Sequence, residues 1–190
     1  MTPEPMVFVV DDDPAVTEAI EELVKLIGLK VRAYHSAGDF LKEYQRNGPA
    51  CLVLDVRMPG ISGLELQKRL AATGDSIPVI IVTGHGDIRM AVDAMKGGAH
   101  EFIEKPFRAQ DLCDSIQKAV QSDQDTWERC RQREEAQRRI EQLTSAEREV
   151  MEMVFAGKTN RSIAAELGLS LRAVEDRRAR MMKKLGIESR

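Results

Sequence analysis

Short apolar runs alternate with amphipathic stretches along the first 120 residues, and this alternation strongly limits the folds open to the chain. The apolar runs are rich in Val and Ile and lie at Met6–Val10, Leu29–Ala33, Cys51–Leu54, Val79–Val82 and, more weakly, Ala99–Ile103. The stretches that repeat apolar residues at helical spacing are Val16–Ile27, Ser36–Gln45, Ser62–Ala72, Asp87–Gly97 and Ala109–Val120. Five strands alternating with five helices predict a doubly wound parallel sheet with helices on both faces.

Polar residues follow the apolar runs at the points where strands are expected to end. Asp11 and Asp12 follow the first run, Asp55 closes the third, Thr83 follows the fourth and Lys105 comes just after the fifth. These ends lie on one edge of an open parallel sheet, so three carboxylates, a hydroxyl and an ammonium are expected to converge there. Clustered carboxylates suit Mg²⁺, and a metal beside an ammonium suits a phosphoryl group.

A structural interpretation exists for each acidic residue taken alone. An Asp after a strand often caps a helix or forms a turn, and Asp13-Pro14 fits a helix start. Agreement at four strand ends is much harder to explain in this way, so the joint pattern favours a binding site.

Four segments then resemble a two-component receiver domain over residues 6–120. They are Val-Val-Asp11-Asp12-Asp13-Pro, Leu-Asp55-Val-Arg-Met-Pro-Gly-Ile-Ser-Gly, Val-Thr83-Gly-His-Gly-Asp and Phe102-Ile-Glu-Lys105-Pro106-Phe. The last two segments are most similar to FixJ-type receivers. The resemblance implies that Asp55 is the phosphoacceptor and that a sensor histidine kinase is the donor. It also implies Mg²⁺ held by Asp12, Asp55 and the Arg57 carbonyl, with Asp11 acting largely through a water.

The same resemblance assigns the remaining site residues. Thr83 is expected to hydrogen-bond the phosphoryl group, Lys105 to pair with it and Phe102 to be the aromatic switch residue. The bond from Lys105 to Pro106 is usually cis in this family. Arg57 and His85 stand at positions that the family varies to tune the lifetime of the phosphoryl group, and Gly60 replaces a frequently acidic residue.

A charged bridge follows the first domain. Residues 115–143 contain no Gly or Pro, and Glu134/Arg138 and Glu135/Arg139 are favourable pairs four residues apart, so the last helix of the first domain is able to continue through this stretch. A rough coiled-coil register is interrupted by charges, which leaves a coiled coil and an isolated solvated helix both open. Trp127 is either a dimer contact or a residue that docks on a domain.

The last 47 residues predict a helix-turn-helix. A capping-box-like start at Thr144–Glu147 opens the first helix, Asn160–Leu167 forms the second and Ser170 caps the third. The third helix is basic, which suits a DNA major groove, although solvated surface charges are the alternative.

The pattern from Leu143 to Leu185 resembles a LuxR-type output domain, and this supports DNA binding. The expected DNA-contacting residues are Lys158, Asn160, Ser170, Arg172, Glu175, Asp176, Arg177, Arg178 and Lys184. Asp176-Arg177 stands where the family often has a neutral residue followed by His, so the target sequence does not transfer. The family's fourth helix would follow Arg190, which leaves the receiver or the bridge to supply the dimer contact.

The formal net charge of −3 divides unevenly along the chain. Residues 1–123 carry 13 basic and 19 acidic side chains, residues 124–143 carry 5 of each, and residues 144–190 carry 10 and 7. The balance excludes a histone-like protein, and no apolar run approaches the roughly 20 residues of a membrane span. The N-terminus lacks a signal peptide's basic region, and three widely spaced cysteines form no disulfide or zinc pattern.

Together these features predict a cytoplasmic bacterial response regulator. We expect a receiver at 1–122, a helical linker at 123–142 and a LuxR-type domain at 143–190. Its expected partners are a sensor histidine kinase, double-stranded DNA, RNA polymerase and, when phosphorylated, a second copy. It is expected to be no enzyme beyond assisting its own phosphotransfer and dephosphorylation. The alternatives are a regulator that works without phosphorylation and a small Mg²⁺-dependent phosphohydrolase.

Overall fold

The computed structural model describes residues 3–84 and 88–187 and divides into two compact units, Met1–Glu128 and Arg129–Arg190. The first unit contains a five-stranded parallel sheet with the strand order β2-β1-β3-β4-β5. The strands are β1 (Met6–Val10), β2 (Lys30–Tyr34), β3 (Ala50–Leu54), β4 (Val79–Thr83) and β5 (Glu101–Glu104). The predicted doubly wound parallel sheet is therefore confirmed.

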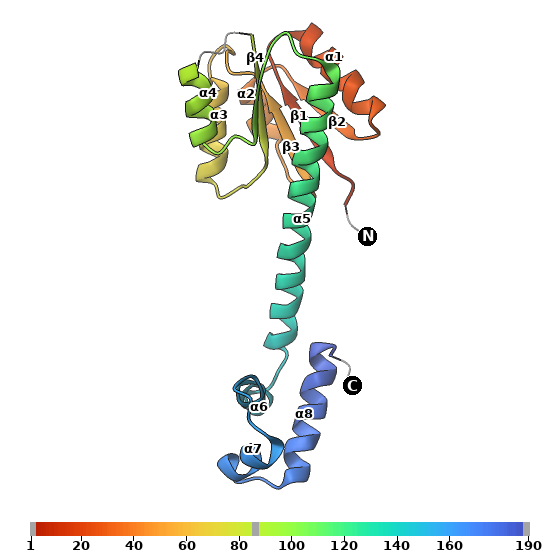
Figure 1. Cartoon of the computed structure of the whole chain (residues 1–190), viewed down its shortest axis with the longest axis vertical. Helices are drawn as coiled ribbons and strands as arrows, with labels where there is room; N and C mark the ends of the chain where they lie inside the picture. The colour runs from red at the N-terminus through yellow and green to blue at the C-terminus, as the bar shows by residue number, and fades with distance from the viewer. Residues whose placement is uncertain (1–2, 85–87, 188–190) are drawn as a thin grey trace. The chain divides into compact units, whose positions relative to one another are not determined.

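Helices cover both faces of this sheet (Figure 1). They are α1 (Pro14–Leu26), α2 (Ala37–Glu43), α3 (Gly63–Ala72), α4 (Ile88–Lys96) and α5 (Ala109–Glu141). Alternate residues of a strand point to opposite faces, so Val7 and Val9 pack with α1 and α5, whereas Phe8 and Val10 pack with α2, α3 and α4. Two apolar cores result, one on each side of the sheet.

Local capping chemistry sets where the helices begin. The side chains of Asp13, Ser36 and Ser62 accept hydrogen bonds from backbone N–H groups of the first helical turns that follow them. Ser36 and Ser62 therefore precede α2 and α3 instead of starting them. The expected helix at 87–97 corresponds to α4, and its first residue, Asp87, lies outside the described residues.

The last helix of the first unit, α5, is much longer than the amphipathic stretch Ala109–Val120 that predicted it. α5 continues without interruption to Glu141, as the absence of Gly and Pro allowed, and its buried positions extend to Asp123. Beyond Glu128, the side chains at 129–138 are all exposed.

The second unit is a three-helix domain made of α6 (Ser145–Phe155), α7 (Asn160–Leu167) and α8 (Leu171–Leu185). Its core contains Leu143, Val150, Ile163, Val174 and Met181. Gly168 ends α7 with a positive φ of 65°, which a residue with a side chain rarely adopts, and Ser170 caps α8 two residues later. The predicted helix-turn-helix is present. No helix in residues 3–84 and 88–187 is long and apolar enough to cross a membrane.

Candidate functional site

Three charged residues meet where β1, β3 and β5 end. The Lys105 Nζ atom donates to Asp11 Oδ2 at 2.6 Å and lies 3.2 Å from Asp55 Oδ1. The sheet register produces this meeting, because the backbone N–H of Asp55 donates to the Val10 carbonyl and aligns the two strand ends. Both carboxylates are nearly inaccessible to solvent, with 4% of the Asp11 side chain and 7% of the Asp55 side chain exposed.

Backbone groups orient the two carboxylates. Asp11 Oδ1 accepts from the Asp13 N–H at 3.0 Å, and Asp55 Oδ2 accepts from the Arg57 N–H at 2.6 Å. Asp13 also caps α1 by accepting from the Ala15 N–H. The start of α1 and the turn after β3 therefore hold the carboxylates in place.

Burial and charge act in opposite directions on the pKa values at this edge. Burial raises the pKa of Asp11, and hydrogen bonds from Lys105 and the Asp13 N–H offset only part of that effect. Burial lowers the pKa of Lys105, but the hydrogen bond and charge of Asp11 together with Asp55 outweigh it and raise the pKa overall. Lys105 is therefore charged at neutral pH and neutralises part of the negative charge beside Asp55.

Thr83 supplies a hydroxyl at the end of β4. It is 1% exposed, and its Oγ1 atom has no hydrogen-bond partner in the part of the chain that the structure describes. The Thr83 carbonyl accepts from the Lys105 N–H at 2.9 Å, so the residue and the lysine are tied to each other through the backbone. A buried hydroxyl without a partner is costly, and a ligand oxygen at this edge would satisfy it.

The third acidic candidate, Asp12, is exposed and lies outside the ion pairs that join Lys105 to Asp11 and Asp55. Over residues 3–84 and 88–187, no three His, Cys, Asp or Glu side chains are arranged to hold a metal ion. Two of the three carboxylates expected at this edge, Asp11 and Asp55, thus contact Lys105, and the exposed Asp12 follows Asp11 directly in the chain. The donor set still fits Mg²⁺, which binds carboxylate and carbonyl oxygens, keeps several waters and needs only one or two protein carboxylates.

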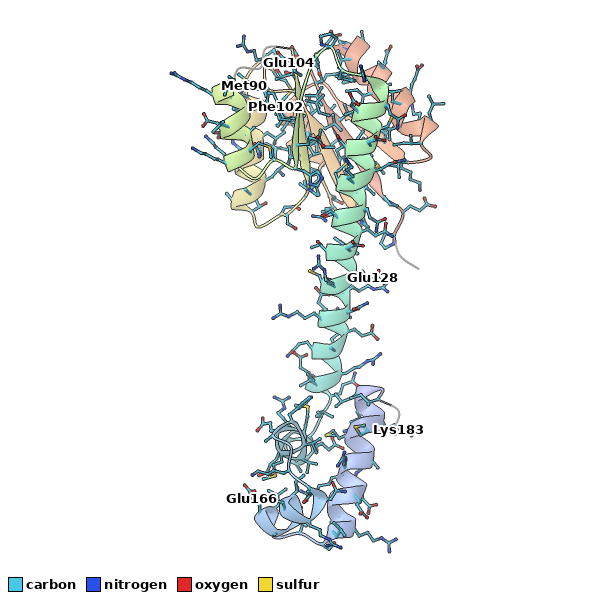
Figure 2. All side chains as sticks on the ribbon, viewed as in Figure 1. Met90, Phe102, Glu104, Glu128, Glu166 and Lys183 are labelled. Atoms are coloured by element: carbon cyan, nitrogen blue, oxygen red, sulfur yellow. The ribbon has the colours of Figure 1, made fainter. Side chains whose placement is uncertain are left out.

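Phe102, the expected switch residue, lies on the α4 side of the site. Phe102 on β5 is half-buried and packs against the same core as Met90 of α4, and Figure 2 shows both residues near Glu104. The peptide bond from Lys105 to Pro106 is cis, as the family resemblance implied. Arg57 is exposed, and His85 lies outside the described residues.

The second unit separates the expected DNA-contacting residues into two groups. Exposed residues on α8 are Arg172, Glu175 and Asp176, and Arg177 is half-buried. The other group makes contacts within the domain: Arg178 Nη1 donates to Asn160 Oδ1 at 2.8 Å, Lys158 pairs with Glu166, Lys184 pairs with Glu147, and the Ser170 hydroxyl accepts from the Ala173 N–H.

Glu147 is a buried carboxylate that the sequence identified only as part of a cap. It accepts from the Thr144 N–H, completing the capping box, and Lys184 of α8 donates to it at 2.6 Å. The hydrogen bonds from Lys184 and Thr144 lower the pKa of Glu147 to about 2. The sequence carried no signal for the partner, because Lys184 lies 37 residues further along the chain.

We expect this ion pair to make the second unit sensitive to acid. The pKa of Glu147 is lower in the folded protein than its ordinary value of 4.5, so its stabilising effect is complete above about pH 4.5 and is lost as the pH falls toward 2. Urea denaturation from pH 6 to pH 2 should show Glu147→Gln less stable than wild type at pH 6, with the difference narrowing toward pH 2. Glu149→Gln, at an exposed position of the same helix, is the control. A difference that is independent of pH would contradict the assignment.

Comparison with known proteins gives both parts of the chain a family. Residues 7–117 match the family described as the response regulator receiver domain, and residues 141–190 match the bacterial regulatory proteins of the luxR family. The response regulator protein TmoT of Ectopseudomonas mendocina is 42% identical over 98% of this chain and 84% of its own length. The transcriptional regulatory protein FixJ of Azorhizobium caulinodans is 42% identical over 94% of this chain and 85% of its own length.

Solved structures agree with these matches. The response regulator StyR has a TM-score of 0.91 at 40% identity, covering 98% of this chain and 94% of that one. Full-length FixJ from B. japonicum has a TM-score of 0.60 at 37% identity, covering 100% of this chain and 93% of that one. The chain belongs to the response regulators that join a receiver domain to a LuxR-type DNA-binding domain.

Proposed function

We propose that Asp55 accepts a phosphoryl group from a sensor histidine kinase and that this reaction controls DNA binding by the LuxR-type domain. The observation that carries the proposal is the contact of Lys105 with Asp11 and Asp55, together with a Thr83 hydroxyl that has no partner in residues 3–84 and 88–187. A carboxylate nucleophile, a fixed cation and an unused hydroxyl on one edge are the groups that binding a phosphoryl group requires.

The residues of the chain account for each part of the transfer. An Asp55 oxygen forms the new bond to phosphorus while the bond from phosphorus to the kinase imidazole nitrogen breaks, and that nitrogen keeps the electron pair. Lys105 offsets the added charge. Mg²⁺, held by Asp11, Asp12, Asp55 and the Arg57 carbonyl, would supply further neutralisation of the phosphoryl oxygens. In a separate later step, attack of water on the same phosphorus breaks its bond to the Asp55 oxygen and releases phosphate, which makes dephosphorylation a property of the same site.

The switch follows from what the new phosphoryl group contacts. Thr83 moves toward it and donates a hydrogen bond to it, and Phe102 turns inward. Ile88, Val92 and Met95 of α4 are 84%, 43% and 48% exposed, so this helix presents an apolar surface on which a second copy can pack. Moving such an equilibrium from about 1% to about 99% active takes about 5.5 kcal/mol of differential stabilisation.

Each part of the chain is assigned one role in this function. Residues 1–122 form the phosphoacceptor receiver, 123–142 the helical linker and 143–190 the DNA-binding domain, with action in the cytoplasm and contact with RNA polymerase. The compact first unit runs past this boundary to Glu128 because α5 keeps contacts there. A phosphohydrolase leaves the luxR-family match at residues 141–190 without a role, and a regulator that works without phosphorylation leaves the cluster of Asp11, Asp55 and Lys105 without one.

Mass measurement with and without a small phosphodonor tests the proposal most directly. We expect a monomer without the donor and, with donor and Mg²⁺, an added phosphoryl group together with a dimer that binds DNA more tightly. A covalent adduct with no change in oligomeric state or DNA affinity would contradict the switch. Absence of any adduct would contradict the phosphoacceptor.

The exposed position of Arg172 at the start of α8 leads to a prediction for DNA binding. Loss of one cationic contact in Arg172→Ala should weaken binding by about 1–3 kcal/mol, roughly 5- to 150-fold, and reduce the salt slope by about one. Arg178→Ala should also weaken binding, through loss of the contact that fixes Asn160. Arg69→Ala, at an exposed position of the receiver helix α3, is the control for charge. Unchanged affinity and salt slope in both variants would show that another surface meets the DNA.

A further inference from the structure

A buried ionic cluster lies at the edge of the sheet opposite the phosphoacceptor. Arg46, in the segment between α2 and β3, is 12% exposed and donates through Nη1 to Asp75 Oδ1 at 2.7 Å. Its Nη2 atom lies 2.5 Å from both carboxylate oxygens of Asp123, a residue of α5 whose side chain is 1% exposed. Asp123 also accepts from the Ala50 N–H at 2.8 Å, and Tyr44 donates its hydroxyl proton to Asp75 at 2.6 Å.

The cluster extends one helical turn further along α5. The Cζ atom of Arg46 lies 5.3 Å from the centre of the Trp127 ring, and Trp127 is half-buried. Asp123 and Trp127 are four residues apart and therefore face the same way on the helix. Directly after this contact the first unit ends at Glu128, which Figure 2 shows on α5. Of the two interpretations that the sequence left open for Trp127, docking on its own domain is the one observed.

Stability alone is a poor explanation for this arrangement. A buried ion pair is often no more stabilising than apolar residues of the same volume, because both charges lose their hydration. What the guanidinium adds is direction, since its planar donors fix two carboxylates and stack on an aromatic ring at defined angles. Through Asp75, Ala50 and Asp123 it connects the segment before β4, the start of β3 and α5.

We propose that Arg46 is the positioning residue that couples the receiver to its output. By holding Asp123 and Trp127, it makes these turns of α5 move with the sheet. A change at the phosphoacceptor edge then reaches residue 128 as a displacement of one rigid body, instead of being lost in bending of the helix. This inference rests on the proposed function, because the signal that it transmits is phosphorylation of Asp55.

The test uses variants of the full-length protein that leave no unpaired charge on Asp123. Asp75, whose side chain is 17% exposed, keeps its hydrogen bonds from the Tyr44 hydroxyl and the Ile77 N–H in each of them. Arg46→Met with Asp123→Asn removes both charges, and the Asn side-chain oxygen remains able to accept from the Ala50 N–H. Arg46→Lys keeps a positive charge beside Asp123. It loses the planar guanidinium that contacts Asp75 and Asp123 together, and with it most of the stacking on Trp127. Arg69→Met, which breaks an exposed ion pair with Glu65, is the matched control.

Three measurements are made on each protein. Acrylamide quenching of Trp127, the only tryptophan of the chain, reports the contact itself. Incorporation of label from a small phosphodonor reports the acceptor chemistry. The ratio of DNA affinities with and without phosphodonor reports the coupling between the two.

In the double variant we expect faster quenching, an unchanged labelling rate and a loss of at least about fivefold in the affinity ratio, the lower range of ordinary coupling between sites. Arg46→Lys should fall between wild type and the double variant, and Arg69→Met should match wild type. A wild-type affinity ratio in either Arg46 variant, or unchanged quenching, overturns the inference. A wild type that takes up no label contradicts the proposed function instead, so the two failures are distinct.

Discussion

Replacing Asp55 by Asn is expected to abolish phosphoryl incorporation from both a kinase and a small phosphodonor. The amide lacks the anionic oxygen that attacks phosphorus, and no other described carboxylate shares Lys105 except Asp11, which the Asp13 N–H already holds. Labelling should fall to the background of the assay. The DNA affinity of the variant should equal that of the unphosphorylated wild type, with or without donor.

The matched control for this prediction is Asp39→Asn. Asp39 lies in the first turn of α2 and is exposed, and its carboxylate accepts from the Ser36 hydroxyl and from Lys42 Nζ. Its loss therefore removes no contact of Asp55 or Lys105. It should label at the wild-type rate. If Asp55→Asn takes up label as well as this control does, Asp55 is not the phosphoacceptor. Thermal denaturation of both variants establishes that each is folded before labelling is compared.

Replacing Thr83 by Val is expected to have opposite effects on stability and on switching. Val keeps the shape of the side chain while removing a buried hydroxyl that has no partner in residues 3–84 and 88–187, so the unphosphorylated protein should become more stable by about 1 kcal/mol. After phosphorylation the missing hydrogen bond to a charged group, worth about 1.5–3 kcal/mol, should reduce the stimulation of DNA binding roughly 10- to 100-fold.

Two measurements distinguish this result from a simple loss of fold. Denaturant midpoints of the unphosphorylated proteins should rank Thr83→Val at or above wild type. Labelling at Asp55 should persist, because the nucleophile and Lys105 are untouched. Full stimulation of DNA binding by the labelled variant would refute a role for Thr83 in the switch. Thr73→Val, in which the hydroxyl donates to the Leu70 carbonyl, is a control for the same chemical change away from the site.

Local patterns in the chain predicted the strands and helices that carry the site. The apolar runs marked each strand to within about two residues, and the polar residues after them predicted which side chains reach the acceptor edge. The helix-turn-helix was predicted equally well, because Gly168 and Ser170 mark the turn between its last two helices. Asp12 shows the limit of these local patterns. They place both Asp11 and Asp12 directly after β1, but they do not tell that the Asp11 side chain is buried and the Asp12 side chain exposed.

The contacts between segments distant in the chain could not be predicted from the sequence. Arg46 and Asp123 are 77 residues apart, and Glu147 and Lys184 are 37 apart, so no periodicity or motif joins them. Lys184 was expected on DNA from its place in a basic helix. The structure adds an internal partner, because the third helix folds back on the start of the first.

By itself, the sequence determined the class of fold, the order of its elements and the residues at the strand ends, because hydrophobic period and turn chemistry are local properties. Tertiary structure alone decided that Lys105 lies between two carboxylates, that the Thr83 hydroxyl is buried with no partner among the described residues and that Arg46 holds α5. Those features depend on the parallel register and on helix packing, which bring together side chains that no local interaction connects.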